Sequence, residues 1–255
     1  MVNSPLTGKR ILITRAVQQT TETTALIEKT GATCIAFPCL EYQVLQDSIQ
    51  QGLSLAKGYS DIVFTSVNGI HAVFKNCSSA HMDELQKKRI AVVGAKTAAA
   101  LKNYGLQASI IPTTSSQQGL IQHYQAHGLP QSMLFFRAED GSDALLEYLQ
   151  NQGVKTCLIK AYRSICPTND NSEVLTMLKK NSIDATLLGS SKTVAHYLQR
   201  IGNLELANRP VLVAISQQVA NAADKLGLKV QLIAKQANFP SMLESLAEYF
   251  SQRSN

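Results

Sequence analysis

Two polar turns, each placed after an apolar run, carry side chains suited to binding an anion. One turn lies within Asp61–Phe74 (DIVFTSVNGIHAVF) and the other within Asp184–Leu198 (DATLLGSSKTVAHYL). In both segments an acidic residue and a strand-like run precede the turn, and a helical pattern follows it. The side-chain donors that these turns offer are Thr65, Ser66, Asn68, Ser190 and Ser191.

Turns of this kind lie at the carboxyl edge of an open parallel sheet, where ligands bind. The helix N-termini that follow them add backbone N–H groups and a favourable dipole. The pattern therefore predicts two anion-binding turns. The alternative is that the same residues are helix caps with no ligand.

Two further strand–turn–helix segments extend this set of candidates. Gly94 follows the run Arg89–Val93 and would let a ligand approach the backbone closely, and Ser216 occupies the corresponding turn after Pro210–Ile215. Additional candidates at the helix start after Gly94 are Lys96 and Thr97.

Arg15 and Arg137 each follow a strand-like run. Because a guanidinium suits carboxylate pairing, both are candidate ligands for an acidic substrate. A structural ion pair is the alternative for each.

Several catalytic and cofactor patterns are missing from the sequence. No GxGxxG follows the first strand-like run, and no GxSxG nucleophile motif occurs. The run Gly189-Ser-Ser-Lys-Thr lacks the Gly-Lys-Ser/Thr of a phosphate loop. His123 and His127 are four residues apart without a third ligand, which favours a surface face over a metal site.

Composition and charge favour an anionic partner, which could be nucleic acid, acidic lipid or an acidic metabolite. The 255 residues carry a net charge of +6, and 45% are hydrophobic, enough for a sizeable core in one or two domains. Trp is absent, which argues against nucleic acid bound by stacking.

The five cysteines form no CxxC and are expected to be reduced thiols in the cytoplasm. MVNSPLTGKR does not resemble a signal peptide, and no run reaches the roughly 18 apolar residues of a membrane span.

Strand and helix patterns alternate through the whole chain and predict an α/β fold with parallel sheets. The expected strands lie at residues 10–14, 33–37, 62–64, 89–93, 109–111, 132–136, 155–161, 184–188, 210–215 and 230–234.

The two halves of the chain are similar in sequence. Arg15 and Arg137 are 122 positions apart, and so are Gly105 and Gly227. Landmarks that keep one spacing predict an internal duplication of a unit of roughly 120 residues.

Each copy could form one contiguous domain, or the first βαβ unit could pack with the last part of the chain. Candidate linkers after equivalent strands favour the second arrangement. It places residues 1–38 and 166–255 in domain 1 and residues 43–160 in domain 2, with 39–42 and 161–165 as linker strands.

Together these features resemble the uroporphyrinogen-III synthase family. The matching motifs are LITR at Leu12–Arg15, IVFTSVNG at Ile62–Gly69, VVGAKTAAAL at Val92–Leu101, Ala161-Tyr162, and SQQVANAADKLG at Ser216–Gly227. Their order and spacing are more specific than any single motif, and the resemblance covers nearly the whole chain.

The resemblance implies two flavodoxin-like α/β domains joined by a two-stranded linker. It implies a lyase of haem biosynthesis that acts on hydroxymethylbilane, a linear tetrapyrrole rich in carboxylates. Such an enzyme removes water, inverts the terminal D ring and closes the macrocycle, without a metal or an organic cofactor.

By the same resemblance, Tyr162 could help the terminal hydroxyl leave, by donating a proton or by orienting water. A phenol with a pKa of roughly 10 is protonated at neutral pH, as an acid must be. A packing tyrosine is the alternative.

The chain departs from the family pattern at two turns. Gly189 stands where many relatives have Thr, and Ser216 and Val219 stand where the first copy has Gly94 and Thr97. Val219 therefore has no hydroxyl to offer, whereas roles of the backbone survive these changes.

We expect a monomeric cytoplasmic lyase that holds hydroxymethylbilane in a cleft between its domains and contacts neither nucleic acid nor membrane. Because closure without inversion proceeds uncatalysed, its main task would be to hold the bilane in one folded shape. That task needs no strong catalytic dyad. The alternative is a non-enzymatic two-domain sensor of an anionic metabolite.

Overall fold

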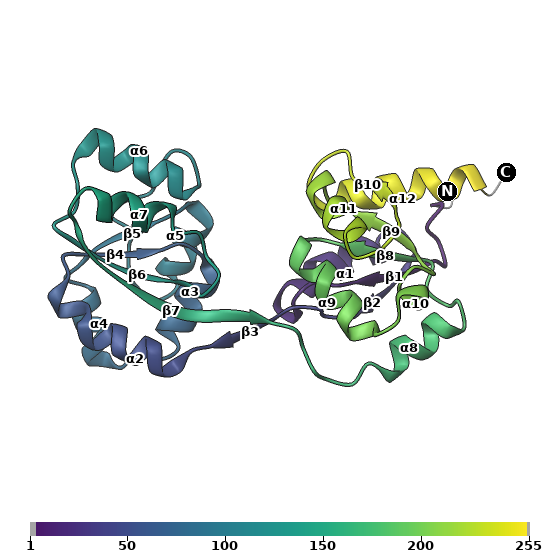
Figure 1. Ribbon diagram of the computed structural model, residues 1–255, viewed down its shortest axis with the longest axis horizontal. Helices are drawn as coiled ribbons and strands as arrows, with labels where there is room; N and C mark the ends of the chain where they lie inside the picture. Colours follow the sequence, from purple (N-terminus) through teal and green to yellow (C-terminus); the bar gives the residue numbers. More distant parts are fainter. Residues whose placement is uncertain (1–3, 254–255) are drawn as a thin grey trace. The chain divides into compact units, whose positions relative to one another are not determined.

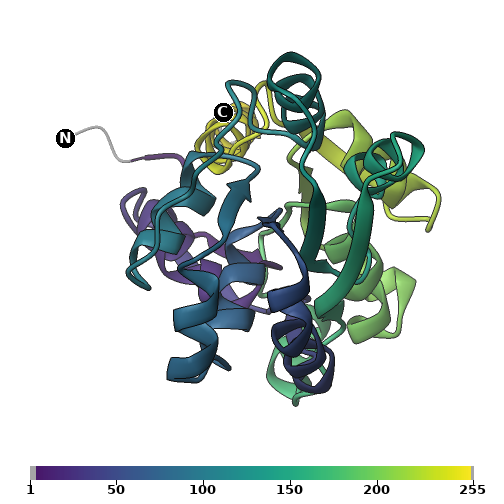
Figure 2. The same cartoon turned by 90° about the vertical axis from the view of Figure 1, so that its left-hand side faces the viewer.

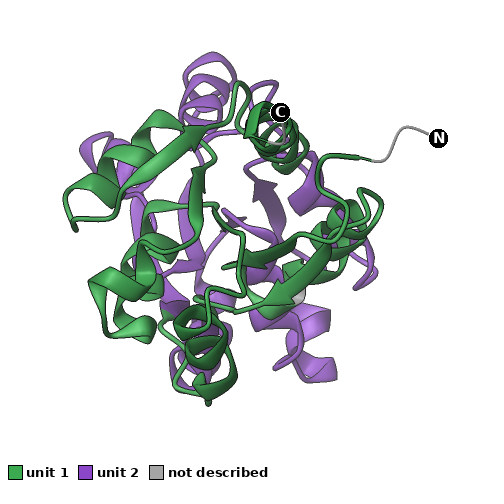
Figure 3. Cartoon of the chain, turned by 90° about the vertical axis from the view of Figure 1, so that its right-hand side faces the viewer, with its two compact units in different colours: residues 1–41, 165–255 green, residues 42–164 purple. Residues whose placement is uncertain are grey.

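The computed structural model describes residues 4–253, apart from the side chain of Gln18, and divides the chain into two compact units. Unit 1 comprises the segment up to Glu41 and the segment from Ile165 onward, and unit 2 is Tyr42–Ser164 (Figure 3). Both crossings lie inside the segments predicted as linkers. Residues 1–3 and 254–255, which the prediction assigned to domain 1, lie outside the described residues, as does the start of the stretch considered for a signal peptide.

Unit 1 contains a five-stranded parallel sheet in the order β10-β9-β8-β1-β2 (Figure 1). Its strands are β1 (Arg10–Ile13), β2 (Thr33–Ala36), β8 (Ala185–Leu188), β9 (Val211–Ala214) and β10 (Val230–Ile233). Ile11 of β1 pairs in register with Cys34 of β2 on one side and with Ala185 of β8 on the other. The opening segment of the chain therefore supplies one inner strand, β1, and one edge strand, β2, of a sheet that the C-terminal segment completes.

Helices cover both faces of this sheet. They are η1 (Val17–Gln19), α1 (Thr20–Glu28), α8 (Ser172–Lys179), α9 (Ser191–Ile201), α10 (Leu204–Ala207), α11 (Gln217–Asp224) and α12 (Phe239–Arg253). Successive strand residues point to opposite faces. Accordingly, Leu12 packs in the core beneath α8–α11, whereas Ile11 and Ile13 pack in the core beneath α1 and α12.

Unit 2 contains a five-stranded sheet in the order β3-β7-β6-β4-β5. Its strands are β3 (Glu41–Val44), β4 (Asp61–Phe64), β5 (Arg89–Val92), β6 (Ser132–Ala138) and β7 (Lys155–Ile165). The pairs β4–β5, β4–β6 and β6–β7 are parallel. Phe64, at the end of β4, lies opposite Val92 of β5 and Phe136 of β6, so these strands end at one common edge.

The helices of unit 2 also form two layers (Figures 1 and 2). They are α2 (Gln46–Leu55), η2 (Ala56–Gly58), α3 (Val67–Phe74), α4 (Ser79–Leu85), α5 (Ala95–Lys102), α6 (Gln117–His127) and α7 (Ala144–Asn151). Ile62 and Phe64 pack in the core shared with α2–α5, and Val63 packs in the core shared with α6 and α7.

The predicted α/β architecture with parallel sheets is confirmed. The two sheets also share a strand order. Starting from Ile110, which forms one parallel bridge to Ala91, the sheet of unit 2 runs through β5, β4, β6 and β7. The strands about 122 positions after Ile110, β5 and β4 are β10, β9 and β8, and those about 122 positions before β6 and β7 are β1 and β2, which is the order of the unit 1 sheet. A duplication would produce this match, and the duplication itself stays a prediction.

Most strands match the expected bounds to within two residues, and two differ more. The strand expected at residues 109–111 is only the bridge between Ala91 and Ile110, because Pro112 follows and has no N–H to continue a ladder. The strand expected at residues 155–161 continues to Ile165 as β7, where β3 lies beside it. Within residues 4–253, no helix has the length and hydropathy to cross a membrane.

Candidate functional site

The structure gathers the candidate residues of unit 2 at the carboxyl edge of its sheet. The turn after β4 carries Thr65, Ser66 and Asn68, and the turn after β5 carries Gly94, Lys96 and Thr97. Arg137 lies near the end of β6, and Tyr162 lies on β7 paired with Ala138. Because these four strands are adjacent and parallel, all of these residues lie along one edge.

Unit 1 repeats this arrangement. Arg15 follows β1, Ser190 and Ser191 follow β8, and Ser216 follows β9. These three strands are neighbours and parallel, so the four residues share one sheet edge within unit 1.

Tyr162 has the most developed polar environment among the candidates. Its side chain is buried, and its hydroxyl oxygen lies 2.9 Å from Ser66 Oγ. Burial raises the pKa of the Tyr162 phenol above its usual value, and the neighbouring Tyr42 adds to this, while hydrogen bonds from Ser66 and Asn68 act in the opposite direction. The phenol is therefore protonated throughout the neutral range.

The hydrogen bonds around Ser66 determine which protons are available. Ser66 is the N-cap of α3, and its Oγ accepts the N–H of Gly69 at 3.0 Å. The Ser66 hydroxyl proton remains and can be donated to Tyr162, whose oxygen also accepts from Asn68. With both neighbours donating, the Tyr162 proton is free to be donated to a third group.

Two residues that the sequence did not single out as functional shape this cluster. The ring of Tyr42 packs edge-on against Tyr162, with centroids 5.6 Å apart at 86°. A Cβ on Gly69 would lie 3.2 Å from Ser66 Oγ and 3.8 Å from the Tyr162 ring. Gly69 was visible only as part of a motif, and Tyr42 lies in the segment interpreted as a linker.

Gly94 makes room for the side chain of Ser115. The carbonyl of Gly94 accepts from Thr97 and Ala98 at the start of α5. A Cβ at this position would lie 2.5 Å from Ser115 Oγ, which only the absence of a side chain permits. Of the other two candidates in this turn, Lys96 is exposed and Thr97 is buried.

The two arginines differ sharply. Arg137 is 2% exposed and forms an ion pair with Asp143, as its structural alternative proposed. Asp143 is the N-cap position of α7 but makes no side-chain capping bond. Arg15 is half-buried, donates to Thr23 Oγ1 at 3.0 Å and to Gln19 Oε1 at 3.3 Å, and lies over the ring of Phe239.

Of the three candidate serines of unit 1, Ser190 and Ser216 are helix caps, and Ser191 is the first residue of α9. Ser190 Oγ accepts the N–H of Thr193 at 3.2 Å, and Thr193 Oγ1 accepts the N–H of Ser190, which forms a capping box on α9. Ser216 Oγ accepts the N–H of Val219 at 3.5 Å at the start of α11. Capping uses the oxygen of each serine as an acceptor. The Ser190 hydroxyl also donates to Thr193 Oγ1 at 3.2 Å, so of these two caps it is Ser216 that keeps a hydroxyl proton to donate to an anion.

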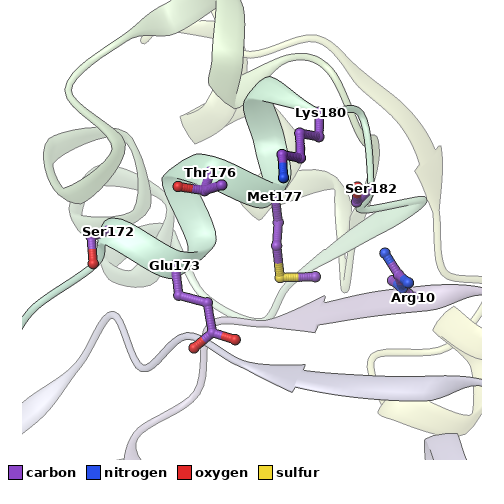
Figure 4. Close-up of a pocket in the computed structure, with 7 residues that line it drawn as sticks. All are labelled: Arg10, Ser172, Glu173, Thr176, Met177, Lys180 and Ser182. Atoms are coloured by element: carbon purple, nitrogen blue, oxygen red, sulfur yellow. The ribbon is translucent and has the colours of Figure 1, made fainter.

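The histidine pair and a surface pocket of unit 1 lie apart from these residues. His123 and His127 stack with centroids 4.4 Å apart on α6, and the described part of the chain contains no group of three potential metal ligands. A pocket of about 430 Å³ lies at the amino edge of the unit 1 sheet and is lined by Arg10, Ser172, Glu173, Thr176, Met177, Lys180 and Ser182 (Figure 4). None of the candidate site residues lines it.

Comparisons with known proteins identify the relatives of this chain. The family model described as uroporphyrinogen-III synthase HemD matches residues 21–244. The uroporphyrinogen-III synthase of Synechococcus elongatus is 26% identical over 99% of both chains, and that of Chlorobaculum parvum is 25% identical over 94% of this chain and 98% of its own.

Solved structures share the fold. The uroporphyrinogen-III synthetase of Helicobacter pylori matches with a TM-score of 0.65 at 15% identity, covering 94% of this chain and 99% of its own. A mutant uroporphyrinogen III synthase from Thermus thermophilus matches with a TM-score of 0.60 at 19% identity, covering 96% and 100%. The family match over residues 21–244, together with this shared fold, shows that the chain belongs to the uroporphyrinogen-III synthase family.

Proposed function

We propose that this protein is a lyase that converts hydroxymethylbilane to uroporphyrinogen III, with loss of water and inversion of the D ring. The observation that carries the proposal is the buried Tyr162 hydroxyl, held by Ser66 and Asn68 at a sheet edge in a chain of this family. This hydroxyl can donate the proton that the family resemblance assigns to Tyr162.

In this proposal Tyr162 acts as the general acid. Its proton passes to the terminal hydroxyl oxygen of the bilane as the carbon–oxygen bond breaks, and the hydroxyl departs as water. The resulting negative charge on Tyr162 is stabilised by donation from Ser66 and Asn68, the two contacts that lower its pKa.

The carboxylates of the bilane would be held by the N-termini of helices and by side-chain donors. The candidate ligands are Arg15, Thr65, Gly94, Lys96, Thr97, Arg137, Ser190, Ser191 and Ser216. Of these, Arg137 has the weakest support, because its guanidinium already pairs with Asp143. Fixing many carboxylates at once would select the folded conformer that closes with inversion.

We also propose that the protein works as a cytoplasmic monomer on this small-molecule substrate, without nucleic acid or membrane partners. All five cysteines are free thiols, as is usual in reducing compartments. The proposed domain limits are 38/43 and 160/166, and the division of contacts between Glu41 and Tyr42 and between Ser164 and Ile165 supports them.

An isomer assay tests the activity. Freshly prepared hydroxymethylbilane is incubated with the pure protein, the products are oxidised, and the type I and type III porphyrins are separated by chromatography. We expect the type III isomer to predominate. If only type I formed, at the rate seen in buffer alone, the proposal would be rejected, and binding of the bilane without turnover would point to a sensor instead.

A further inference from the structure

Arg15 and Arg137 occupy equivalent positions but have different electrostatic environments. Arg137 is buried and paired with Asp143. The hydrogen-bond partners of Arg15 are neutral oxygens of Thr23 and Gln19, and among residues 4–253 no carboxylate forms an ion pair with it. Of the two cations, Arg15 is therefore the one whose charge is not already neutralised by the protein.

The guanidinium of Arg15 lies against the ring of Phe239, with its central carbon 4.5 Å from the ring centroid. Phe239 is the first residue of α12, which follows β10 at the same sheet edge. Stacking on an aromatic face fixes the plane of a guanidinium and leaves its in-plane N–H groups free. Arg15 has five such donors, and the protein uses two of them.

Gly189 determines where the Phe239 ring can lie. A Cβ on Gly189 would meet Cζ of Phe239 at 3.2 Å, closer than ordinary van der Waals contact. The residue that departs from the family pattern thus provides the space for the ring. Ser190, the cap of α9, is the next residue, so this contact lies directly beside a candidate substrate turn.

We propose that Arg15 binds a side-chain carboxylate of the bilane. Phe239, packed on Gly189, is then the positioning residue that fixes the plane of the Arg15 guanidinium. This inference rests on the proposed function and adds to it a specific carboxylate ligand with its support. A carboxylate in the guanidinium plane can accept two parallel N–H bonds, and this arrangement is lost when the plane is free to turn.

The test replaces the aromatic face while keeping an apolar side chain. In Phe239→Leu we expect the KM for hydroxymethylbilane to rise about three- to tenfold with little change in kcat, because the lost cation–π contact affects binding of a remote group. Phe239→Tyr, which keeps the aromatic ring, should have the same KM as the unmodified protein. Phe250→Leu is the matched control, because Phe250 lies in the same helix beneath another cation, Lys9, at 4.6 Å, and its KM should not change.

Double variants separate positioning from general packing. Arg15→Gln should raise the KM, and adding Phe239→Leu to it should raise the KM no further. Gly189→Ala should raise the KM by displacing the ring but should have no effect once Phe239 is Leu. An unchanged KM in Phe239→Leu, or independent effects of the Arg15 and Phe239 changes, would overturn the inference.

A binding measurement keeps this inference separate from the proposed activity. Quenching of uroporphyrin III fluorescence reports affinity for a stable macrocyclic polycarboxylate without any turnover, and Phe239→Leu should weaken it by a similar factor. Should that variant fail to fold by circular dichroism, Gly189→Ala serves the same purpose with α12 intact. Wild-type protein that forms the type III isomer while these variants bind normally would reject the inference and leave the proposed function standing.

Discussion

At the scale of single residues, the chemistry of this chain depends on how each polar group is paired. Tyr162 keeps its proton because burial raises its pKa, while Ser66 and Asn68 can support the charge left after donation. Arg137 has its charge neutralised by Asp143. Arg15, which also follows a strand, hydrogen-bonds only neutral oxygens, so the two arginines differ in what they can offer an anionic ligand.

Replacing Tyr162 with Phe removes the proposed acid and keeps the ring. We expect kcat for type III formation to fall about 100-fold, at the lower end for loss of a general acid, while the fold is retained. Initial rates with hydroxymethylbilane measure the change, and circular dichroism monitors the fold.

Tyr104→Phe provides the matched control for Tyr162→Phe. Its hydroxyl bonds to His71 at 3.0 Å in the same unit and has no proposed role in the reaction. Its kcat should equal that of the unmodified protein. Full turnover in Tyr162→Phe would remove Tyr162 from the mechanism.

The Arg137–Asp143 pair is predicted to contribute to stability. Asp143→Ala leaves a buried cation without its partner, and we expect the free energy of unfolding to fall by about 2–3 kcal/mol, less than for a fully buried pair because Asp143 is half exposed. Urea denaturation measures this loss. Glu139→Ala, which breaks the exposed pair with Lys160, should cost less than about 0.5 kcal/mol.

The opposite pattern would contradict this interpretation of Arg137. If Asp143→Ala left stability unchanged and instead altered the KM, the guanidinium would be a substrate ligand. The sequence left both possibilities open, because the deciding residue is a partner six positions further on. The position 122 residues before Asp143 holds Thr21, which has no charge.

At the scale of elements, the alternating pattern predicted the strands well because each is a short apolar run bounded by turns. β4 and β8 are buried along their whole length, as the runs after Asp61 and within Asp184–Leu188 indicated. Close approaches could not be predicted in the same way. The packing of Ser115 against Gly94, and of Phe239 against Gly189, joins segments that only the folded chain brings together.

Gly52 offers a test of such a close approach. This residue lies inside α2, and a Cβ there would be 2.6 Å from Ile159 Cγ1 and 2.8 Å from Phe136 Cε1. We expect Gly52→Ala to lower the free energy of unfolding by about 1–2 kcal/mol, because overpacking outweighs the gain in helix propensity. Thermal and urea unfolding measure the change.

Gly58→Ala is the control at a glycine with open surroundings. A Cβ on Gly58 meets no atom within 4 Å, and stability should change by less than about 0.5 kcal/mol. A stabilising effect of Gly52→Ala would show that α2 can move away from β6 and β7 at little cost.

At the scale of the whole molecule, each unit has its own buried core on both faces of its sheet. The sequence predicted this because apolar and polar residues follow the strand and helix periods throughout. Both cores contain a tyrosine that is almost fully buried, Tyr124 in unit 2 and Tyr197 in unit 1. Burial is the main cause that raises the pKa of each phenol above its ordinary value.

These raised pKa values predict that the protein loses stability at alkaline pH. In the unfolded chain a tyrosine ionises near pH 10, whereas in the folded chain Tyr124 and Tyr197 stay neutral to higher pH. Above about pH 10 the folded state therefore binds more protons than the unfolded state, and the free energy of unfolding falls as pH rises, by up to about 1.4 kcal/mol per pH unit for each group. Urea unfolding from pH 8 to pH 11.5 measures the slope.

Phenylalanine variants assign the slope to individual residues. Tyr124 has no hydrogen-bond partner for its hydroxyl among the described residues, so Tyr124→Phe should cost little at pH 8 and should reduce the alkaline slope. Tyr197 donates to the carbonyl of Ala207 at 2.9 Å, so Tyr197→Phe should lower the free energy of unfolding by about 1 kcal/mol at pH 8. It should reduce the alkaline slope as much as Tyr124→Phe does. Equal slopes in the unmodified protein and in Tyr124→Phe would show that the Tyr124 phenol is more accessible to solvent than its burial indicates.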